Sequence, residues 1–207
     1  MDHVESKKQH WETIYDTKKL NEVSWYQAVP ETSLNFINSA EVSKDAQIID
    51  IGGGDSFLAD NLISLGYTNL SVLDISGNAI ERAKKRLGEN ADEVTWIVSD
   101  ITAFKPSISY DIWHDRAAFH FLTSSEDIRK YLDTMESAIT PKGYLILGTF
   151  SENGPTKCSG IEIKQYSIEE LKTAIPDIFK FIEGKNIDHP TPSGSMQNFT
   201  FCKFQKI

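Results

Sequence analysis

The stretch QIIDIGGGDSFL, residues 47–58, joins a short apolar run to an acid, three glycines and the start of a helical pattern. A glycine turn between a strand and a helix lets the backbone approach a ligand, and the N–H groups at the helix start point toward that ligand. Gly52 and Gly54 fit the dinucleotide fingerprint, but Phe57 replaces its third glycine and Asp55 adds a charge that repels a pyrophosphate. An acid on each side of the turn favours a cofactor that carries a cation rather than a phosphate.

Two further strand-like runs end in acids. The run 70–75 contains Asp74 near its end, and the run 94–98 is followed by Asp100 and Ile101. In an open α/β sheet, an acid after the second strand accepts hydrogen bonds from ribose hydroxyls. Each aspartate could instead simply close a turn, since Asp does this readily. Three successive strands ending in acids, with helical patterns between them, favour a nucleoside site.

The glycine turn resembles the first motif of the class I S-adenosylmethionine-dependent methyltransferase family, Asp-x-Gly-x-Gly-x-Gly, with Ser56 in place of the last glycine. S-adenosylmethionine carries a sulfonium and an ammonium and has no phosphate, which suits the two acids. The resemblance implies that the glycines hold the methionine end, that Asp74 holds the ribose, and that Asp100 and Ile101 hold the adenine. The cofactor residues implied for the three strand ends are Asp50, Gly52, Gly53, Gly54, Asp74, Ile75, Asp100 and Ile101.

The composition limits the function classes. The chain has 207 residues, of which 40% are hydrophobic and 25% are charged, enough for one sizeable core. No stretch approaches the ~20 apolar residues of a membrane span, and the polar start predicts a cytoplasmic protein. A net charge of −9 disfavours a nucleic-acid substrate. Cys158 and Cys202 lie in no metal-ligand spacing, so we expect free thiols and no metal. The basic run 82–86 is expected to be a solvated helix face.

Hydrophobic periodicity predicts the fold. Apolar residues recur at helical spacing in three segments, strand-like runs lie between them, and Ser167 with Glu170 forms a capping box. The last two strand-like runs have no helix between them, so they should pair antiparallel. We therefore expect an α/β fold, a Rossmann-like doubly wound sheet of seven mostly parallel strands that ends in an antiparallel hairpin, as in the resembled family. The helical segments are 57–65, 78–87 and 126–139; the later strands are 110–113, 144–150 after a turn at 141–143, 179–187 and 198–204, the last two joined by a loop at 189–194. We expect a single domain over 1–207, comprising an N-terminal helical cap (1–45), a cofactor-binding core (46–150), and a specificity loop, helix and terminal hairpin (151–207).

The leader is rich in large aromatic residues: Trp11, Tyr15, Trp25 and Tyr26. They could form a lid whose aromatic faces attract a sulfonium by cation–π contacts, worth ~0.5–2 kcal/mol. Alternatively, a helix over 7–16 could pack its aromatic side on the sheet edge. The pattern HWETIY…SWYQ resembles the leader of small stand-alone methyltransferases. That resemblance implies cofactor contacts for Trp11, Tyr15 and Trp25, and we place Tyr26 with the methyl acceptor.

The run after the fourth strand contains the candidate catalytic residues. His114 or His120 could accept a proton from the acceptor, and Asp115 could orient the histidine. His114 is also counted among the cofactor contacts. Arg116 could bind a carboxylate with two parallel hydrogen bonds. Each of these side chains could instead make only local hydrogen bonds.

Cys158 and His189 lie in expected loops at the rim of the sheet, where specificity residues are common. We place both with the acceptor.

The resemblance implies S-adenosylmethionine-dependent methyl transfer to an unidentified acceptor. The sequence Asn/Asp-Pro-Pro-Tyr/Phe of DNA-adenine and glutamine-amide methylating enzymes is absent, so those acceptors are not expected. The chain shows no accessory region for gripping a macromolecule, which favours a small molecule. Three alternatives stay open: a protein lysine methyltransferase, an NAD-dependent oxidoreductase and a non-catalytic cofactor-binding scaffold. We expect a monomer or a homodimer, with no membrane partner.

Overall fold

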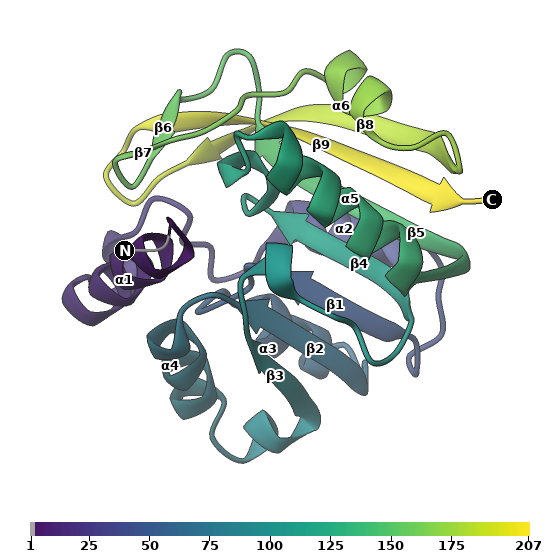
Figure 1. The fold of residues 1–207 in the computed structure, drawn as a ribbon. Helices are drawn as coiled ribbons and strands as arrows, with labels where there is room; N and C mark the ends of the chain where they lie inside the picture. The colour runs from purple at the N-terminus through teal and green to yellow at the C-terminus, as the bar shows by residue number, and fades with distance from the viewer. Residues whose placement is uncertain (1–2) are drawn as a thin grey trace.

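A computed structural model describes residues 3–207 and arranges them around one seven-stranded sheet (Figure 1). The strand order is β3-β2-β1-β4-β5-β9-β8, in which β1 to β5 pair in parallel and β9 runs antiparallel to both β5 and β8. This confirms the predicted doubly wound sheet with a terminal antiparallel hairpin. The strands are β1 (Gln47–Ile51), β2 (Asn69–Asp74), β3 (Val94–Val98), β4 (Tyr110–Arg116), β5 (Ile139–Phe150), β8 (Phe179–Pro190) and β9 (Met196–Lys206).

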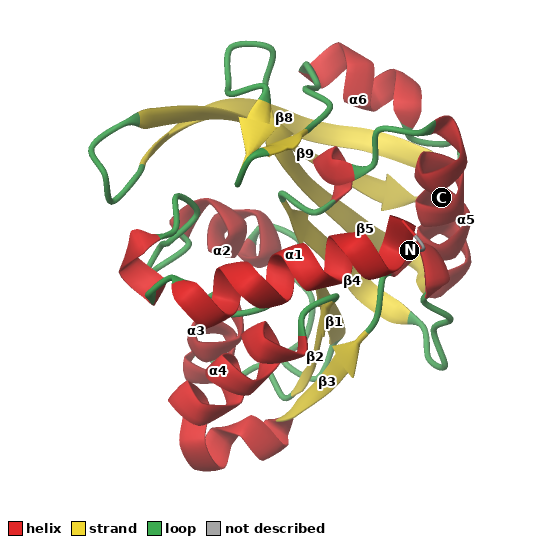
Figure 2. Cartoon of the chain, turned by 60° about the vertical axis from the view of Figure 1, so that its left-hand side comes forward, coloured by secondary structure: helices red, strands yellow, loops and turns green. Residues whose placement is uncertain are grey.

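Helices cover both faces of the sheet (Figure 2). One face packs against α2 (Glu31–Asn38), α3 (Leu58–Ser64) and α4 (Gly77–Leu87), and the other against α5 (Ser125–Ala138) and α6 (Ile168–Ala174). Serine side chains cap the starts of α4, α5 and α6, and the capping box predicted for Ser167 and Glu170 is present. None of the helices described within residues 3–207 is long and apolar enough to cross a membrane.

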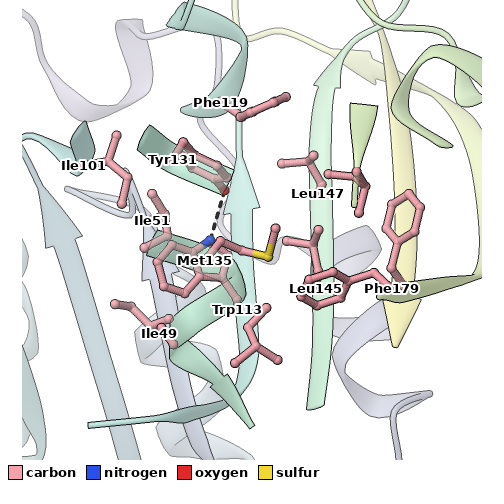
Figure 3. Packing of buried hydrophobic residues seen from close by; sticks show 14 of the residues in the cluster. Ile49, Ile51, Ile101, Trp113, Phe119, Tyr131, Met135, Leu145, Leu147 and Phe179 are labelled. Atoms are coloured by element: carbon pink, nitrogen blue, oxygen red, sulfur yellow. Dashed lines mark hydrogen bonds between the residues drawn. The ribbon is translucent and has the colours of Figure 1, made fainter. Parts of the chain in front are cut away.

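The α5 side of the sheet holds a core rich in aromatic residues (Figure 3). Trp113 of β4 is fully buried, and its indole Nε1 donates a hydrogen bond to the hydroxyl of Tyr131 at 3.0 Å. Phe119 packs on the same Tyr131 ring, with ring centroids 4.7 Å apart. The indole N–H is therefore paired as well as buried, which avoids the cost of an unsatisfied polar group.

Three elements differ from the sequence prediction. The turn expected at 141–143 lies within β5, where the register jumps from the pair Tyr110–Ile139 to the pair Ile112–Tyr144, so the extra residues form a bulge. The hairpin turn begins only after Pro190, because β8 extends two residues into the expected loop. The specificity loop contains a small unpredicted hairpin, β6 (Lys157–Cys158) and β7 (Ile161–Glu162).

The leader helix α1 (His3–Thr17) lies across the carboxyl ends of the strands rather than on either face (Figures 1 and 2). The carboxylate of Glu12 accepts hydrogen bonds from Ser76 Oγ at 2.7 Å and from the amides of Gly77 and Asn78, each at 2.9 Å. These amides are the free donors at the start of α4, so the acid also suits the helix dipole there. Glu12 thereby fixes α1 to the loop that follows β2.

The basic run on α4 was expected to be solvated, and this was wrong for two of its members. Arg82 donates to the main-chain oxygens of Tyr15 and Lys18 in the leader at 2.7 and 2.8 Å. Arg86 forms ion pairs with Asp55 and Asp60. Both arginines therefore tie separate segments together, which their helical spacing alone does not reveal.

Candidate functional site

A cavity of about 930 Å³, counting the part open to solvent, lies at the carboxyl ends of the central strands beneath α1. Ligand sites of open α/β sheets lie at this edge. Many of the residues predicted to bind cofactor or acceptor meet in its wall. They are Trp11, Tyr15, Trp25, Gly52, Asp74, Ile75, Asp100, Ile101, Arg116 and Cys158.

The glycine turn has no room for side chains. Gly52 and Gly54 have φ values of +65° and +40°, a backbone region that favours glycine. A Cβ at Gly53 would overlap the Asp50 carboxylate, and one at Gly54 would lie 2.6 Å from Asp74 Oδ2. Gly53 and Gly54 therefore keep the backbone close to two carboxylates, and Gly52 keeps it close to Ala118, as a cofactor cradle requires. Of the three, Gly52 lines both the large cavity and a smaller one beside it, and Gly53 lines only the smaller one.

Asp74 is 5% exposed at the end of β2, and its Oδ1 accepts a hydrogen bond from the amide of Ser76 at 2.8 Å. Burial raises the pKa of Asp74 to about 7, repulsion from Asp50 and Glu12 adds to the rise, and the Ser76 amide opposes it. A buried carboxylate in a cavity wall is an acceptor for hydroxyl donors on a ligand. The arrangement fits the ribose contact implied for Asp74.

Asp100 lies at the next strand end and caps the short 3-10 helix Ile101–Ala103. Its Oδ1 accepts hydrogen bonds from both the amide and the hydroxyl of Thr102 at 2.7 Å. The turn-closing role considered for this aspartate is therefore real. Asp100 and Ile101 nevertheless line the cavity, so the cap also fixes their positions beside a ligand.

Asp55 does not present a free charge to the site. It is 4% exposed and forms ion pairs with Arg82, at 2.9 Å, and with Arg86. Burial raises the pKa of Asp55, while the two guanidinium groups oppose that rise. The repulsion of a pyrophosphate inferred for this residue is therefore largely cancelled. Discrimination against a dinucleotide must come from the other features of the turn.

The leader aromatics form a cluster over the cavity. The ring of Trp11 lies 6.0 Å from that of Trp25, 6.3 Å from that of Tyr15 and 5.1 Å from that of Phe121, measured between centroids. Trp11, Tyr15, Trp25 and Phe121 all line the cavity. The two readings of the leader are thus compatible, because the rings pack on one another and also cover the site. Tyr26 points elsewhere and packs against Phe57.

His114 lies in the wall of the smaller cavity, away from the lining of the large one. Its Nδ1 contacts Asp50 Oδ1 at 2.7 Å and its Nε2 contacts Ser33 Oγ at 2.9 Å. A carboxylate only accepts, so Nδ1 carries a hydrogen. Both ring nitrogens are engaged, and a role as the acceptor's base finds no support in this geometry. Through Asp50, which also accepts from Ser56 at 3.4 Å, His114 supports the glycine turn.

The other two candidate catalytic residues are fully buried. Asp115 accepts hydrogen bonds from the amides of Ala118 and Phe119 and from the hydroxyl of Tyr131, and burial raises its pKa to about 6. His120 accepts from the amide of Phe150, and burial lowers its pKa to about 3. Neither side chain lines the cavity. The predicted proton transfer through Asp115 and His120 is therefore not supported by this geometry. Their hydrogen bonds instead hold the chain after β4 in place.

The predicted acceptor residues separate into two pairs. Arg116 and Cys158 line the cavity, and burial raises the pKa of the Cys158 thiol to about 11. His189 does not line it, since its Nδ1 accepts from Gln27 Nε2 at 3.1 Å and its Nε2 donates to the Ser24 carbonyl at 2.7 Å. His189 therefore positions the leader. Tyr26 is also absent from the cavity lining.

The sequence analysis did not identify the wall of the cavity that β5 and β9 form. Phe150 at the end of β5 and Phe199 in β9 pair across the sheet, with ring centroids 4.7 Å apart. Gln197, two residues earlier in β9, also lines the cavity, and its Oε1 is buried without a hydrogen-bond partner in the part of the chain that the structure describes. The antiparallel register brings these residues together, and no spacing motif marks them.

Within residues 3–207, no three His, Cys, Asp or Glu side chains form a group that could hold a metal ion.

Comparisons with known proteins agree with this geometry. A family model described as a methyltransferase domain matches residues 42–190. A ubiquinone biosynthesis O-methyltransferase of Rickettsia bellii (strain OSU 85-389) is 24% identical over 143 residues, covering 69% of this chain and 58% of that protein. Human EEF1A lysine methyltransferase 2 is 19% identical over 203 residues, covering 91% of this chain and 78% of that protein.

The fold is similar to the crystal structure of a SAM-dependent methyltransferase from Anabaena variabilis, with a TM-score of 0.77 and 13% identity over 100% of this chain and 96% of that one. At this identity the likeness concerns the fold alone. The chain spans less than two thirds of the length of the Rickettsia relative. The match of the methyltransferase-domain model to most of the chain shows that this protein belongs to that family, as its resemblance to the class I S-adenosylmethionine-dependent methyltransferases predicted.

Proposed function

We propose that the protein transfers the methyl group of S-adenosylmethionine to a small-molecule acceptor. The observation that carries this proposal is the buried Asp74 carboxylate in the cavity wall, beside a turn in which Gly53 and Gly54 leave no space for a Cβ. Asp74 would hold the ribose, Asp100 and Ile101 the adenine, and the glycine turn the methionine end. When bound, S-adenosylmethionine supplies an electrophilic methyl group on a good leaving group.

The chain's own contribution is positioning and exclusion of water. Trp11, Tyr15 and Trp25 cover the cavity, and the Glu12 contacts with the start of α4 hold α1 in place. No histidine lines the cavity among the described residues, and burial moves the pKa of Cys158 away from neutrality. We infer that alignment of the acceptor supplies most of the rate enhancement, as well-oriented reactions allow.

A protein lysine acceptor is the second candidate. It is favoured by the human EEF1A lysine methyltransferase 2, which aligns with most of this chain. Against it, the cavity lies beneath α1 and is lined toward β5 and β9 by Phe150 and Phe199, surroundings that suit a small apolar acceptor. An NAD-dependent oxidoreductase and a non-catalytic scaffold are the remaining alternatives.

We also propose a cytoplasmic location, in keeping with two buried free thiols, Cys158 and Cys202.

Calorimetric titration with S-adenosylmethionine, S-adenosylhomocysteine and NADH tests the cofactor. We expect binding of the first two and none of NADH. Binding of NADH alone would replace S-adenosylmethionine with NAD as the cofactor. If none of the three compounds bound, the proposed cofactor site would be wrong. Tritium transfer from labelled S-adenosylmethionine to small-molecule or protein fractions then separates the two acceptor classes. Labelled protein without labelled metabolite would overturn the small-molecule proposal.

A further inference from the structure

Arg116, the last residue of β4, brings to the cavity a positive charge that forms no ion pair with a carboxylate of the described chain. Its Nη1 donates to Gln27 Oε1 at 2.7 Å and its Nη2 to the Trp25 carbonyl at 3.0 Å, and both partners are neutral. Among residues 3–207, no carboxylate oxygen lies within 4.0 Å of this guanidinium. A guanidinium has five N–H donors, so its remaining donors are available to a ligand. Burial lowers the pKa of Arg116, which shows the cost of this placement, and the more distant charge of Asp50 opposes that fall.

The cavity is divided by charge. Asp74 and Asp100 lie at the ends of β2 and β3, which we call the cofactor half. The wall toward β5 and β9, which we call the acceptor half, consists of Phe150, Phe199, Cys158 and the uncharged Gln197. Arg116 lies between the halves, since β4 pairs with β1 on one side and β5 on the other.

The other cation in the lining is already paired. Lys7 on α1 contacts Asp127 of α5 at 3.4 Å. Arg116 is thus the cation in the cavity wall that has no carboxylate of the described chain within 4.0 Å, and Asp50 acts on it only from a greater distance. A partly buried, unpaired guanidinium is costly, and a ligand anion removes that cost when it binds. The charge therefore points to an anionic group on a ligand.

The guanidinium is fixed before any ligand arrives. Gln27, which accepts from Arg116, also donates to His189 Nδ1, and His189 in turn donates to the carbonyl of Ser24. This chain of contacts connects β4, the leader and β8. A guanidinium held in one orientation loses little entropy when it binds a carboxylate with two parallel hydrogen bonds.

We propose that the methyl acceptor is a small apolar molecule that carries a carboxylate, and that Arg116 binds this carboxylate. The apolar walls of the acceptor half match the body of such a molecule, and a single guanidinium matches one negative charge better than the two of a phosphate monoester. The inference rests on the proposed function in one respect, namely that the cofactor occupies the half that contains Asp74 and Asp100. The alternative for Arg116 is the carboxylate of the cofactor's own methionine end, and the test separates the two.

Calorimetry on protein saturated with S-adenosylhomocysteine provides the test. The probes are hexanoate, benzoate, phenylacetate and indole-3-acetate, each compared with its primary amide, and phenyl phosphate as a dianion. We expect at least one acid to bind about tenfold or more tightly than its amide, the size of a charge-assisted hydrogen-bond contribution. Phenyl phosphate should bind more weakly than that acid.

Two variants identify the residue responsible. Arg116→Gln should reduce the ratio of the affinities for an acid and its amide (the acid-to-amide ratio) to within about twofold. Arg116→Lys keeps the positive charge but not the planar guanidinium that makes two parallel hydrogen bonds, so it should retain part of the preference. Lys7→Gln is the matched control, since it removes the other cation of the lining, and it should leave the ratio unchanged. S-adenosylhomocysteine affinity is measured on the same samples and reports whether the cofactor half is intact.

The outcomes are distinguishable. Failure of the unaltered protein to bind S-adenosylhomocysteine would contradict the proposed function itself. Binding of S-adenosylhomocysteine with no acid preferred over its amide would overturn only the carboxylate proposal. A tenfold or greater loss of S-adenosylhomocysteine affinity in Arg116→Gln, with an unchanged acid-to-amide ratio, would assign the guanidinium to the cofactor instead. Tighter binding of phenyl phosphate than of every acid would replace the carboxylate with a phosphate.

Discussion

Asp74 combines burial with a functional charge, which predicts a conflict between stability and binding. Burial raises its pKa from 3.8 to about 7, so the unfolded chain ionises first as the pH rises. The native protein therefore loses stability between about pH 4 and pH 7, and the loss is constant above that range. We predict that Asp74→Asn raises the Tm of the ligand-free protein at pH 8 but not at pH 4. The same variant should weaken S-adenosylhomocysteine binding about ten- to a hundredfold, as expected for a lost hydrogen bond to a charged group.

Thermal scans at pH 4, 6 and 8, with calorimetry at pH 8, measure both effects. Asp133→Asn on the exposed surface of α5 is the matched control and should change neither Tm nor affinity. A lower Tm for Asp74→Asn at pH 8 would show that the carboxylate is stabilising in place. An unchanged affinity for S-adenosylhomocysteine would show that Asp74 does not bind the cofactor.

At the scale of elements, local patterns were sufficient to predict the seven strands of the main sheet, but not the small hairpin of β6 and β7 or the contacts between elements. The strand ends that carry Asp74 and Asp100 follow from period and turn chemistry, which are local. The bulge in β5 was missed because Pro141-Lys142-Gly143 is a good turn sequence, and only pairing with β4 keeps it within the strand. The contacts of His114 could not be predicted for a similar reason, since its partners Asp50 and Ser33 lie 64 and 81 residues away in the chain.

The leader helix provides an element-scale prediction, because one of its carboxylates makes several hydrogen bonds to the start of α4. Glu12 accepts hydrogen bonds from Ser76 Oγ and from the amides of Gly77 and Asn78. Hydrogen bonds to a charged group contribute about 1.5–3 kcal/mol, so Glu12→Ala should reduce hydrogen-exchange protection in residues 5–17 by about ten- to a hundredfold. Since α1 roofs the cavity, dissociation of S-adenosylhomocysteine should also become faster.

Hydrogen exchange followed by mass spectrometry, together with stopped-flow release of S-adenosylhomocysteine, measures the two effects. Glu5→Ala is the matched control, because Glu5 lies on the same helix and is exposed. Protection in β1 and β4 should stay as it is in the unaltered protein. If Glu12→Ala and Glu5→Ala behave alike, the aromatic cluster around Trp11 holds the helix without the carboxylate.

At the scale of the whole molecule, the strand order separates the two ends of the cavity. Asp100 follows β3 and Phe199 lies in β9, five steps apart in the sheet, which is about 24 Å. Substitutions at such distances add independently, so Asp100→Asn and Phe199→Leu should change the free energy of unfolding additively to within about 0.5 kcal/mol. Phe150 and Phe199 pack with ring centroids 4.7 Å apart, so Phe150→Leu and Phe199→Leu should couple by about 0.5–1.5 kcal/mol.

Urea unfolding of both double-mutant cycles measures these coupling energies, provided that the slopes with denaturant stay equal. Coupling between Asp100 and Phe199 as large as that between Phe150 and Phe199 would mean that the sheet transmits strain from one end of the cavity to the other. Additivity between the substitutions at Asp100 and Phe199 would have a different consequence. Because β9 joins the sheet through β5 alone on its inner side, the hairpin can then change its cavity-lining residues without disturbing the strand ends that carry Asp74 and Asp100. The acceptor preference would then be set by the hairpin and Arg116, on a cofactor half that folds the same way whichever acceptor is bound.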